Sequence, residues 1–148
     1  MDYESLQAKD ILVPVDGTAA TFDALALACV LSKRNKGTVY AVYVIEVART
    51  MALDAEMNTE AEHGEGVLQR AEDIAEGLDY EVAGELLQAR DAANAIVDEA
   101  IEREVSAIIL GINYERPLGE EFQLSNTAEY VVRNAPCQVI LCRSSVRE

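Results

Sequence analysis

The sequence predicts a single α/β domain, a parallel sheet with helices on both faces, from two features of its pattern. Short apolar runs rich in valine and isoleucine alternate with segments whose apolar residues recur every three or four positions. Strands that alternate with helices are joined by right-handed crossovers, which make the strands parallel and place the helices over the sheet. The 148 residues contain no internal repeat or linker, so we expect residues 1–148 to form one domain.

The first half of the chain is predicted to hold two strands and two helices. Residues 11–15 are a β-branched run typical of a buried strand, and Asp16 follows as a turn residue and helix cap. A helical pattern leads from there to the second strand, residues 39–47. Residues 48–64 are irregular and acidic, which indicates a loop or a frayed helix start, and the second helix is expected to end near Gly77.

The third strand and the third helix come next. Residues 80–87 predict the strand, and Asp91 then caps a helix with an apolar stripe over residues 92–101. Glu99 and Arg103 lie on the side of this helix that we expect to face solvent.

The last part of the chain has the order strand, loop, helix, strand. Residues 107–111 are an apolar strand that ends on a glycine, and residues 112–124 form a polar loop. A helix opens at Ser125 and is stopped by Pro136, before a final strand over residues 137–142. A strand, a loop and a helix N-terminus in this order expose backbone N–H groups that can hold an anion.

Ligands of such sheets bind beyond the carboxyl ends of the strands, where the strand order reverses. This rule places Asp16, the end of the second strand near Val44, and Gly111 along one rim. Asp16 also stands directly before a helix, so a purely structural role as a cap is an equal alternative.

The chain is strongly acidic, with a net charge of −15 from 27 Asp and Glu against 12 Lys and Arg. Nucleic acids and anionic membranes require clustered cations, so we expect neither as a partner. The composition fits a halophilic protein or an ordinary acidic cytoplasmic one, and leaves the two open. Residues 1–10 do not resemble a signal peptide, and no apolar run approaches the ~20 residues of a membrane span, which predicts a cytoplasmic protein.

Outside the rim, no group of residues has a catalytic or metal-binding pattern. The cysteines lie in apolar segments without CxxC spacing, which predicts reduced core residues; they are Cys29, Cys137 and Cys142. His63 is the only histidine and lies in an acidic segment, so we expect a surface residue rather than a base. Four tyrosines are expected in the core or at an interface: Tyr40, Tyr43, Tyr80 and Tyr130.

Three segments of the chain resemble the universal stress protein family. They are Ile-Leu-Val-Pro-Val-Asp-Gly-Thr at 11–18, Ala-Val-Tyr-Val-Ile-Glu at 41–46 and Thr-Ala-Glu-Tyr-Val-Val-Arg-Asn-Ala-Pro-Cys at 127–137. The last is the most specific, and the resemblance covers nearly the whole chain. It implies an adenine-nucleotide alpha-hydrolase-like fold, with a five-stranded parallel sheet in the order 3-2-1-4-5.

The resemblance also implies a homodimer that pairs through the final strand. The residues of that interface would be Val139, Ile140 and Leu141. A local reason supports this, because an unpaired edge strand is otherwise a template for aggregation.

One branch of the family binds ATP through a glycine, two residues, a second glycine, nine residues and then Gly-Ser or Gly-Thr. The chain keeps the first glycine as Gly111, has Tyr114 at the second position, and has Ser125-Asn126 in place of Gly-Ser, with one extra residue in the loop. The resemblance implies nucleotide contacts, from adenosine to phosphates, at Pro14, Val15, Asp16, Val44, Leu110, Gly111, Ser125, Asn126 and Thr127.

The loop departs from the ATP-binding pattern in bulk and in charge. Glycine lets the backbone approach a phosphate closely, whereas Tyr114 places a large ring there. Glu115, Glu120 and Glu121 outnumber the one cation, Arg116, and each unfavourable charge costs on the order of 1 kcal/mol near the surface. AMP-like ligands are penalised less, because they bring less charge.

We therefore favour a homodimeric regulatory or binding module with a degenerate nucleotide pocket and no required cofactor, at most a weak ATP hydrolase. The alternative is an ATP- or AMP-binding member that uses Asp16, Gly111 and residues 125–127. An unrelated flavodoxin-like or electron-transfer flavoprotein-like domain is disfavoured by the low aromatic content and the missing phosphate glycines.

Overall fold

The computed structural model describes residues 8–114 and 122–144. A five-stranded parallel sheet in the order β3-β2-β1-β4-β5 forms its centre, as the resemblance implied. The strands are β1 (Ile11–Pro14), β2 (Val39–Glu46), β3 (Ala83–Ala89), β4 (Ala107–Ile112) and β5 (Gln138–Arg143). The expectations for Glu115, Arg116, Glu120 and Glu121 fall outside the described residues.

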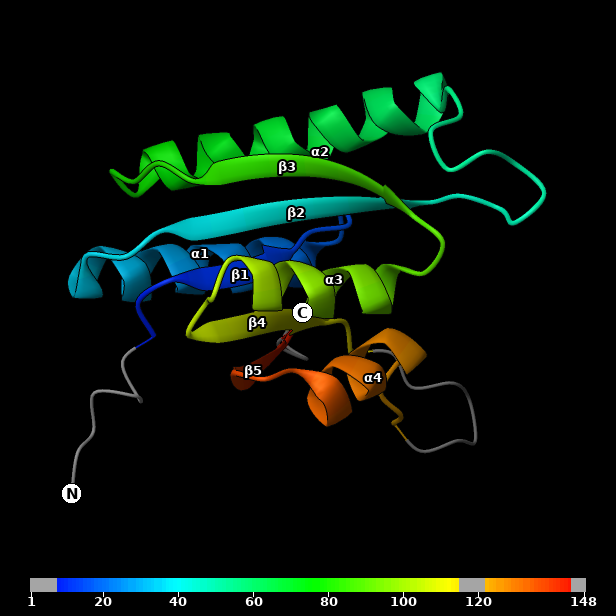
Figure 1. Cartoon of the computed structure of the whole chain (residues 1–148). Helices are drawn as coiled ribbons and strands as arrows, with labels where there is room; N and C mark the ends of the chain where they lie inside the picture. The colour runs from blue at the N-terminus through cyan, green and yellow to red at the C-terminus, as the bar shows by residue number, and fades with distance from the viewer. Residues whose placement is uncertain (1–7, 115–121, 145–148) are drawn as a thin grey trace.

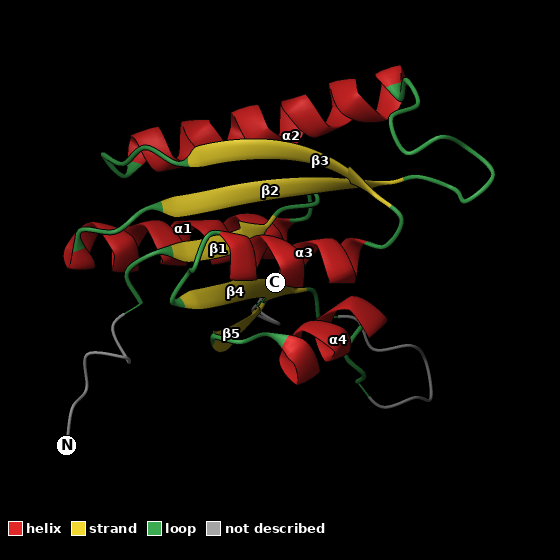
Figure 2. Cartoon of the chain, viewed as in Figure 1, coloured by secondary structure: helices red, strands yellow, loops and turns green. Residues whose placement is uncertain are grey.

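Two helices cover each face of the sheet (Figures 1 and 2). They are α1 (Ala19–Asn35), α2 (Asn58–Gly77), α3 (Ala92–Glu102) and α4 (Asn126–Asn134). One buried cluster lies under α1 and α2, and a second lies under α3 and α4. This arrangement confirms, for the central strands β1, β2 and β4, the prediction that they are apolar because both of their faces are buried.

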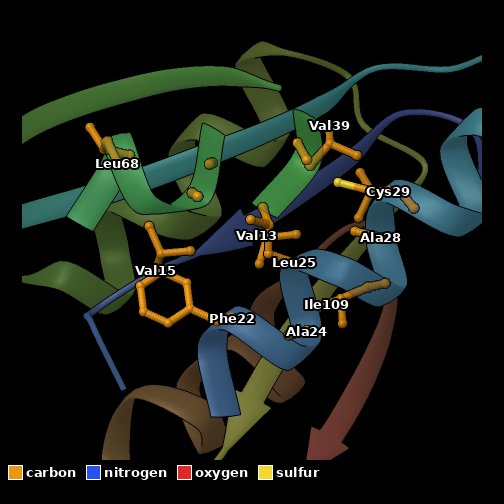
Figure 3. Packing of buried hydrophobic residues seen from close by; sticks show 14 of the residues in the cluster. Val13, Val15, Phe22, Ala24, Leu25, Ala28, Cys29, Val39, Leu68 and Ile109 are labelled. Carbon is orange, nitrogen blue, oxygen red and sulfur yellow. The ribbon is translucent and has the colours of Figure 1, made fainter. Parts of the chain in front are cut away.

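The cluster under α1 shows how the side chains alternate along the strands (Figure 3). Val13 of β1 and Ile109 of β4 point towards Leu25 of α1, and all three side chains are fully buried. Their neighbours Leu12 and Ile108 point to the opposite face and pack with α3 and α4. Each burial of such a side chain contributes about 1.5–3 kcal/mol, so the two clusters hold the layers together.

Several boundaries differ from the prediction, most of them by one residue. β3 begins at Ala83 instead of residue 80, because pairing with β2 starts where Tyr40 meets Ala83. α2 begins at Asn58, well inside the segment predicted to be irregular. α1 ends at Asn35, and its C-cap Lys36 has the left-handed conformation, at φ 59°.

The apolar stripe predicted over residues 92–101 is not buried throughout. Ile101, at its end on α3, is 55% exposed, as is Val30 on α1, because other residues of each helix face the sheet. Tyr130, expected in the core or at an interface, is exposed on α4.

Glu99 and Arg103, predicted to face solvent, are instead half-buried beside the sheet. The guanidinium carbon of Arg103 lies 4.5 Å from the centre of the Tyr40 ring, and Arg103 also pairs with Glu99 and with Glu85 of β3. α3 lies over β2, so the last turn of this helix meets the strands instead of water. Within the described ranges, no helix has the length and hydropathy required to cross a membrane.

Candidate functional site

A cavity of about 380 Å³ opens at the carboxyl edge of the sheet. One side is formed by the ends of β1 and β2 with the first turn of α1, and we call it the strand wall: Pro14, Val15, Asp16, Thr21, Val42, Tyr43 and Val44. The other side, which we call the helix wall, comes from the starts of α3 and α4: Ala92, Ile96, Ser125 and Thr127. The volume of the cavity lies within the range of small-molecule sites, about 300–1,000 Å³.

The strand wall is held by backbone and side-chain hydrogen bonds around Asp16. The Val15 N–H donates to Val42 O at 2.9 Å, which extends the β1–β2 ladder to the rim. Asp16 Oδ1 accepts from the Thr18 N–H at 2.9 Å and from the Thr18 hydroxyl at 2.6 Å, and the Thr21 hydroxyl lies 3.2 Å away. Asp16 was predicted to be the helix cap, but the cap position is Thr18, and Asp16 supports it from two residues earlier.

Asp16 Oδ2, in contrast, makes no hydrogen bond to any described residue. The carboxylate is exposed at the rim, so this oxygen can accept a hydrogen bond from a ligand. Burial and the negative charges of Asp16 and Glu60 raise the pKa of the nearby Tyr43. The Tyr43 phenol is therefore neutral at physiological pH and can donate its proton.

The helix wall presents hydroxyl groups and a helix start. Ser125 Oγ accepts from the Ala128 N–H at 3.1 Å and so caps α4, as predicted. The Ser125 hydroxyl proton is still free to be donated, and Thr127 adds a second hydroxyl. The first N–H groups of α4 have no partner within the helix, which favours an anion at this wall.

Gly111 does not line the cavity. A Cβ atom at this position would lie 2.4 Å from Ala20 O and 2.6 Å from the Thr21 Cα, so the glycine lets β4 approach the first turn of α1. Because side chains alternate along a strand, Gly111 shares the α1 face with Ile109, whereas the cavity opens towards α3 and α4.

Tyr114 joins the end of β4 to the end of β5. Its ring stacks on Phe122, with centroids 5.8 Å apart, and the Arg143 guanidinium lies 4.7 Å from the ring centre. The Tyr114 N–H donates to Ser144 Oγ at 2.8 Å. The residue that replaces the second glycine of the ATP-binding pattern is thus part of a packed cluster.

A model of the universal stress protein family matches residues 7–143. The chain belongs to this family. Universal stress protein MJ0531 of Methanocaldococcus jannaschii is 30% identical over an alignment of length 146, which covers 95% of this chain and 85% of that protein. The solved universal stress protein of Archaeoglobus fulgidus has a TM-score of 0.77 and 24% identity, over 90% of this chain and 97% of its own.

Several proteins of the same fold have been solved with nucleotides. An Archaeoglobus fulgidus universal stress protein in complex with dAMP has a TM-score of 0.71 and 20% identity, over 91% of this chain and 98% of its own. Structures of similar fold also hold cAMP and AMP.

Six of the nine nucleotide-contact residues implied by the family resemblance line the cavity: Pro14, Val15, Asp16, Val44, Ser125 and Thr127. The other three, Leu110, Gly111 and Asn126, are not among its lining residues. Sequence reasoning missed Thr21, Val42, Tyr43, Ala92 and Ile96. The alternation that links Val42 to Val44 could have indicated one of them, but the approach of α3 depends on the tertiary packing.

β5 lies at one edge of the sheet, and within the described residues it hydrogen-bonds to β4 alone. Val139 and Ile140 are half-buried, whereas Leu141 is 42% exposed. Pairing of this strand with a second copy stays a prediction.

The three cysteines and the histidine are not among the residues that line the cavity. Cys29 is a buried residue of α1, and this burial raises the pKa of its thiol to about 11. Cys137 and Cys142 are half-buried at the two ends of the last strand, where burial also raises their pKa values. His63 is exposed, as predicted, and its ring meets Tyr43 edge-on with centroids 5.9 Å apart.

Proposed function

We propose that this universal stress protein is a homodimeric regulatory module whose cavity binds the adenosine part of a nucleotide and prefers AMP to ATP. The observation that carries the proposal is the convergence of Asp16, Val44, Ser125 and Thr127 on one cavity at the carboxyl edge. Ligands of parallel α/β sheets bind at this edge. The related folds solved with dAMP, cAMP and AMP support an adenine nucleotide as the ligand class.

The two walls offer different contacts to such a ligand. Val42, Val44 and Ile96 provide an apolar surface for a flat base, and Asp16 Oδ2 can accept from a ribose hydroxyl. Ser125, Thr127 and the start of α4 then meet the phosphate nearest to the sugar.

A triphosphate finds less support beyond that first phosphate. The glycine-rich cradle of the ATP-binding branch is replaced here by Tyr114, which packs between Phe122 and Arg143. Gly111, the retained glycine, gives its open side to α1. Among the described residues, Gly111 and Tyr114 therefore do not offer the close backbone approach that would hold the outer phosphates.

The described side chains at the cavity support a regulatory role. Asp16 is the one carboxylate among the described lining residues, and no thiol or imidazole stands with it there as a nucleophile–base pair. In such a role, binding of the nucleotide would change the conformation of the protein or its assembly.

Isothermal titration with adenosine, AMP and ATP, each with and without magnesium, tests the ligand. We expect AMP to bind at least about tenfold more tightly than ATP, because two further phosphates bring charge without donors. Tighter binding of ATP would support the alternative of an ATP-binding member. No heat from AMP at millimolar concentration would show that the cavity is not a nucleotide site.

Light scattering tests the homodimer, with a matched pair of variants. Leu141→Arg on β5 is expected to give a monomer, because it places a charge on the strand proposed to pair. Val132→Arg on α4 is the control, since Val132 is exposed to a similar extent, 48% against 42% for Leu141. A monomeric wild-type protein at all working concentrations would rule out the dimer.

A further inference from the structure

A second cavity, of about 270 Å³, lies between α1 and α2 on the other side of the turn that holds Asp16. It is lined by Gly17, Phe22, Glu62, His63, Gly66, Val67 and Arg70. Asp16 lines the first cavity and Gly17 lines the second, so one peptide unit separates the two. None of the nucleotide-contact residues implied by the family resemblance lines this second cavity.

Two side chains that can carry positive charge border this space. His63 and Arg70 are seven residues apart on α2, which puts them on one face of the helix, roughly 10 Å apart along its axis. Between them, Gly66 has nothing within 4 Å of where its Cβ would be, so the space between the two side chains is open.

Both side chains are directed to the cavity edges by the turn and by α1. His63 Nε2 lies 3.9 Å from the place of a Cβ on Gly17, which has φ of 95°. The Arg70 guanidinium carbon lies 5.1 Å from the centre of the Phe22 ring. Stacking on an aromatic face leaves the guanidinium N–H groups free to donate at the edge of the plane.

Arg70 has no ion-pair partner in the described part of the chain. No carboxylate there lies within ion-pair distance of its guanidinium, although the chain carries 27 Asp and Glu. Glu62 is the one carboxylate among the described residues that line the cavity, and Asp16 and Glu60 act electrostatically on Tyr43, whose ring meets His63. The guanidinium of Arg70 is therefore available to an anion at this concave surface.

We propose that the cavity between α1 and α2 is a binding site for a free tetrahedral oxyanion of the phosphate or sulfate class. Arg70 donates paired N–H groups to two oxygens of the anion, in the geometry that guanidinium offers to such ligands. His63, when protonated, donates from the opposite side. The site is distinct from the nucleotide cavity, but an anion bound here adjoins the turn that orients Asp16.

The only histidine of the chain provides a direct probe. Sulfate, which does not titrate near neutral pH, is added to the full-length protein at constant ionic strength and constant pH. We expect a saturable shift of the His63 imidazole proton resonances. A shift that grows linearly with sulfate and does not saturate would overturn the proposal.

Three variants of the same protein locate the anion. Arg70→Gln should raise the dissociation constant for sulfate about fivefold or more, since it removes a charged donor. Gly66→Leu should abolish binding by filling the space, while Leu favours the helix more than Gly does. Arg34→Gln removes the same charge from an exposed site on α1 and should leave binding unchanged. Equal losses in Arg34→Gln and Arg70→Gln would reduce the effect to net charge and overturn the site.

Adenosine and AMP separate a free anion from the phosphate of a nucleotide. Adenosine should not reproduce the sulfate-induced shift, and sulfate binding should persist in Ser125→Ala, because Ser125 lines the nucleotide cavity and not the second one. The opposite result has three parts: AMP shifts the His63 resonances, sulfate does not shift them, and Ser125→Ala abolishes the effect of AMP. In that case the oxyanion belongs to a nucleotide, and the proposal of a free-anion site is wrong. That outcome would leave the proposed nucleotide function standing.

Discussion

The two walls of the main cavity are built in different ways. The strand wall consists of the ends of two central strands, joined by the ladder bond from Val15 to Val42 and by the hydrogen bonds that Asp16 accepts. The helix wall consists of two helix starts, each capped by its own side chain, Asp91 on α3 and Ser125 on α4. The position of the strand wall follows from the register of the sheet, whereas the helix wall depends on how α3 and α4 pack.

This difference suggests that the two walls can vary separately. The strand wall has the Asp16 and Val44 positions that the family resemblance assigns to adenosine. Beside the helix wall, the loop that would hold the outer phosphates begins with a packed tyrosine instead of a glycine. A change in the loop can therefore alter phosphate preference without disturbing the contacts to the nucleoside.

The largest effect is expected for Gly111→Ala, which disturbs the first turn of α1 in the strand wall. The new Cβ would meet the backbone of Ala20 and Thr21, so α1 or β4 must move, at a cost of about 3 kcal/mol in the free energy of unfolding. Gly77→Ala is the control, because nothing lies within 4 Å of its Cβ, and it should stabilise α2 by about 0.5–1 kcal/mol. Urea denaturation measures both, and equal effects of the two substitutions would contradict the role given to Gly111.

Asp16→Ala should act mainly on the strand wall. Loss of the hydrogen bonds to Thr18 should cost about 1–2 kcal/mol of stability, and adenosine affinity should fall about tenfold. Calorimetry with adenosine measures the affinity, at a temperature where circular dichroism shows the variant to be folded. Asp16→Asn keeps one acceptor oxygen and should lose less stability. An unchanged adenosine affinity in both variants would mean that Asp16 is only a structural residue.

Ser125→Ala should act on the helix wall. Removal of the cap should destabilise the protein by about 1 kcal/mol and weaken AMP binding several-fold, while adenosine binding stays as it was. Asp91→Ala is the matched control, because it removes the equivalent cap from α3. A comparable loss of AMP affinity in Asp91→Ala would attribute the effect to helix fraying instead of a phosphate contact.

The smallest effect is expected for Tyr114→Gly, which restores a glycine at the second position of the ATP pattern. ATP affinity should rise about two- to threefold, because the ring no longer blocks the backbone, while adenosine affinity stays constant. Stability should fall slightly through loss of the stacking with Phe122. A fall in ATP affinity would show that the tyrosine contributes to the site.

The amino-acid sequence by itself determined the order of the elements, the burial of the sheet on both faces and the caps at Asp91 and Ser125, because these depend on periodicity and on hydrogen bonds within a few residues. The family resemblance added the strand order and most of the cavity residues. Both the periodicity and the family resemblance are patterns of residues that lie close together in the sequence.

Only the tertiary structure decided that Gly111 faces α1, that Arg103 lies over Tyr40, and that His63 and Arg70 border a second cavity. Each of these facts depends on which face of a strand or helix meets an element far away in the sequence. Local patterns give the periodicity of an element, and the packing of the layers decides which side chains come together.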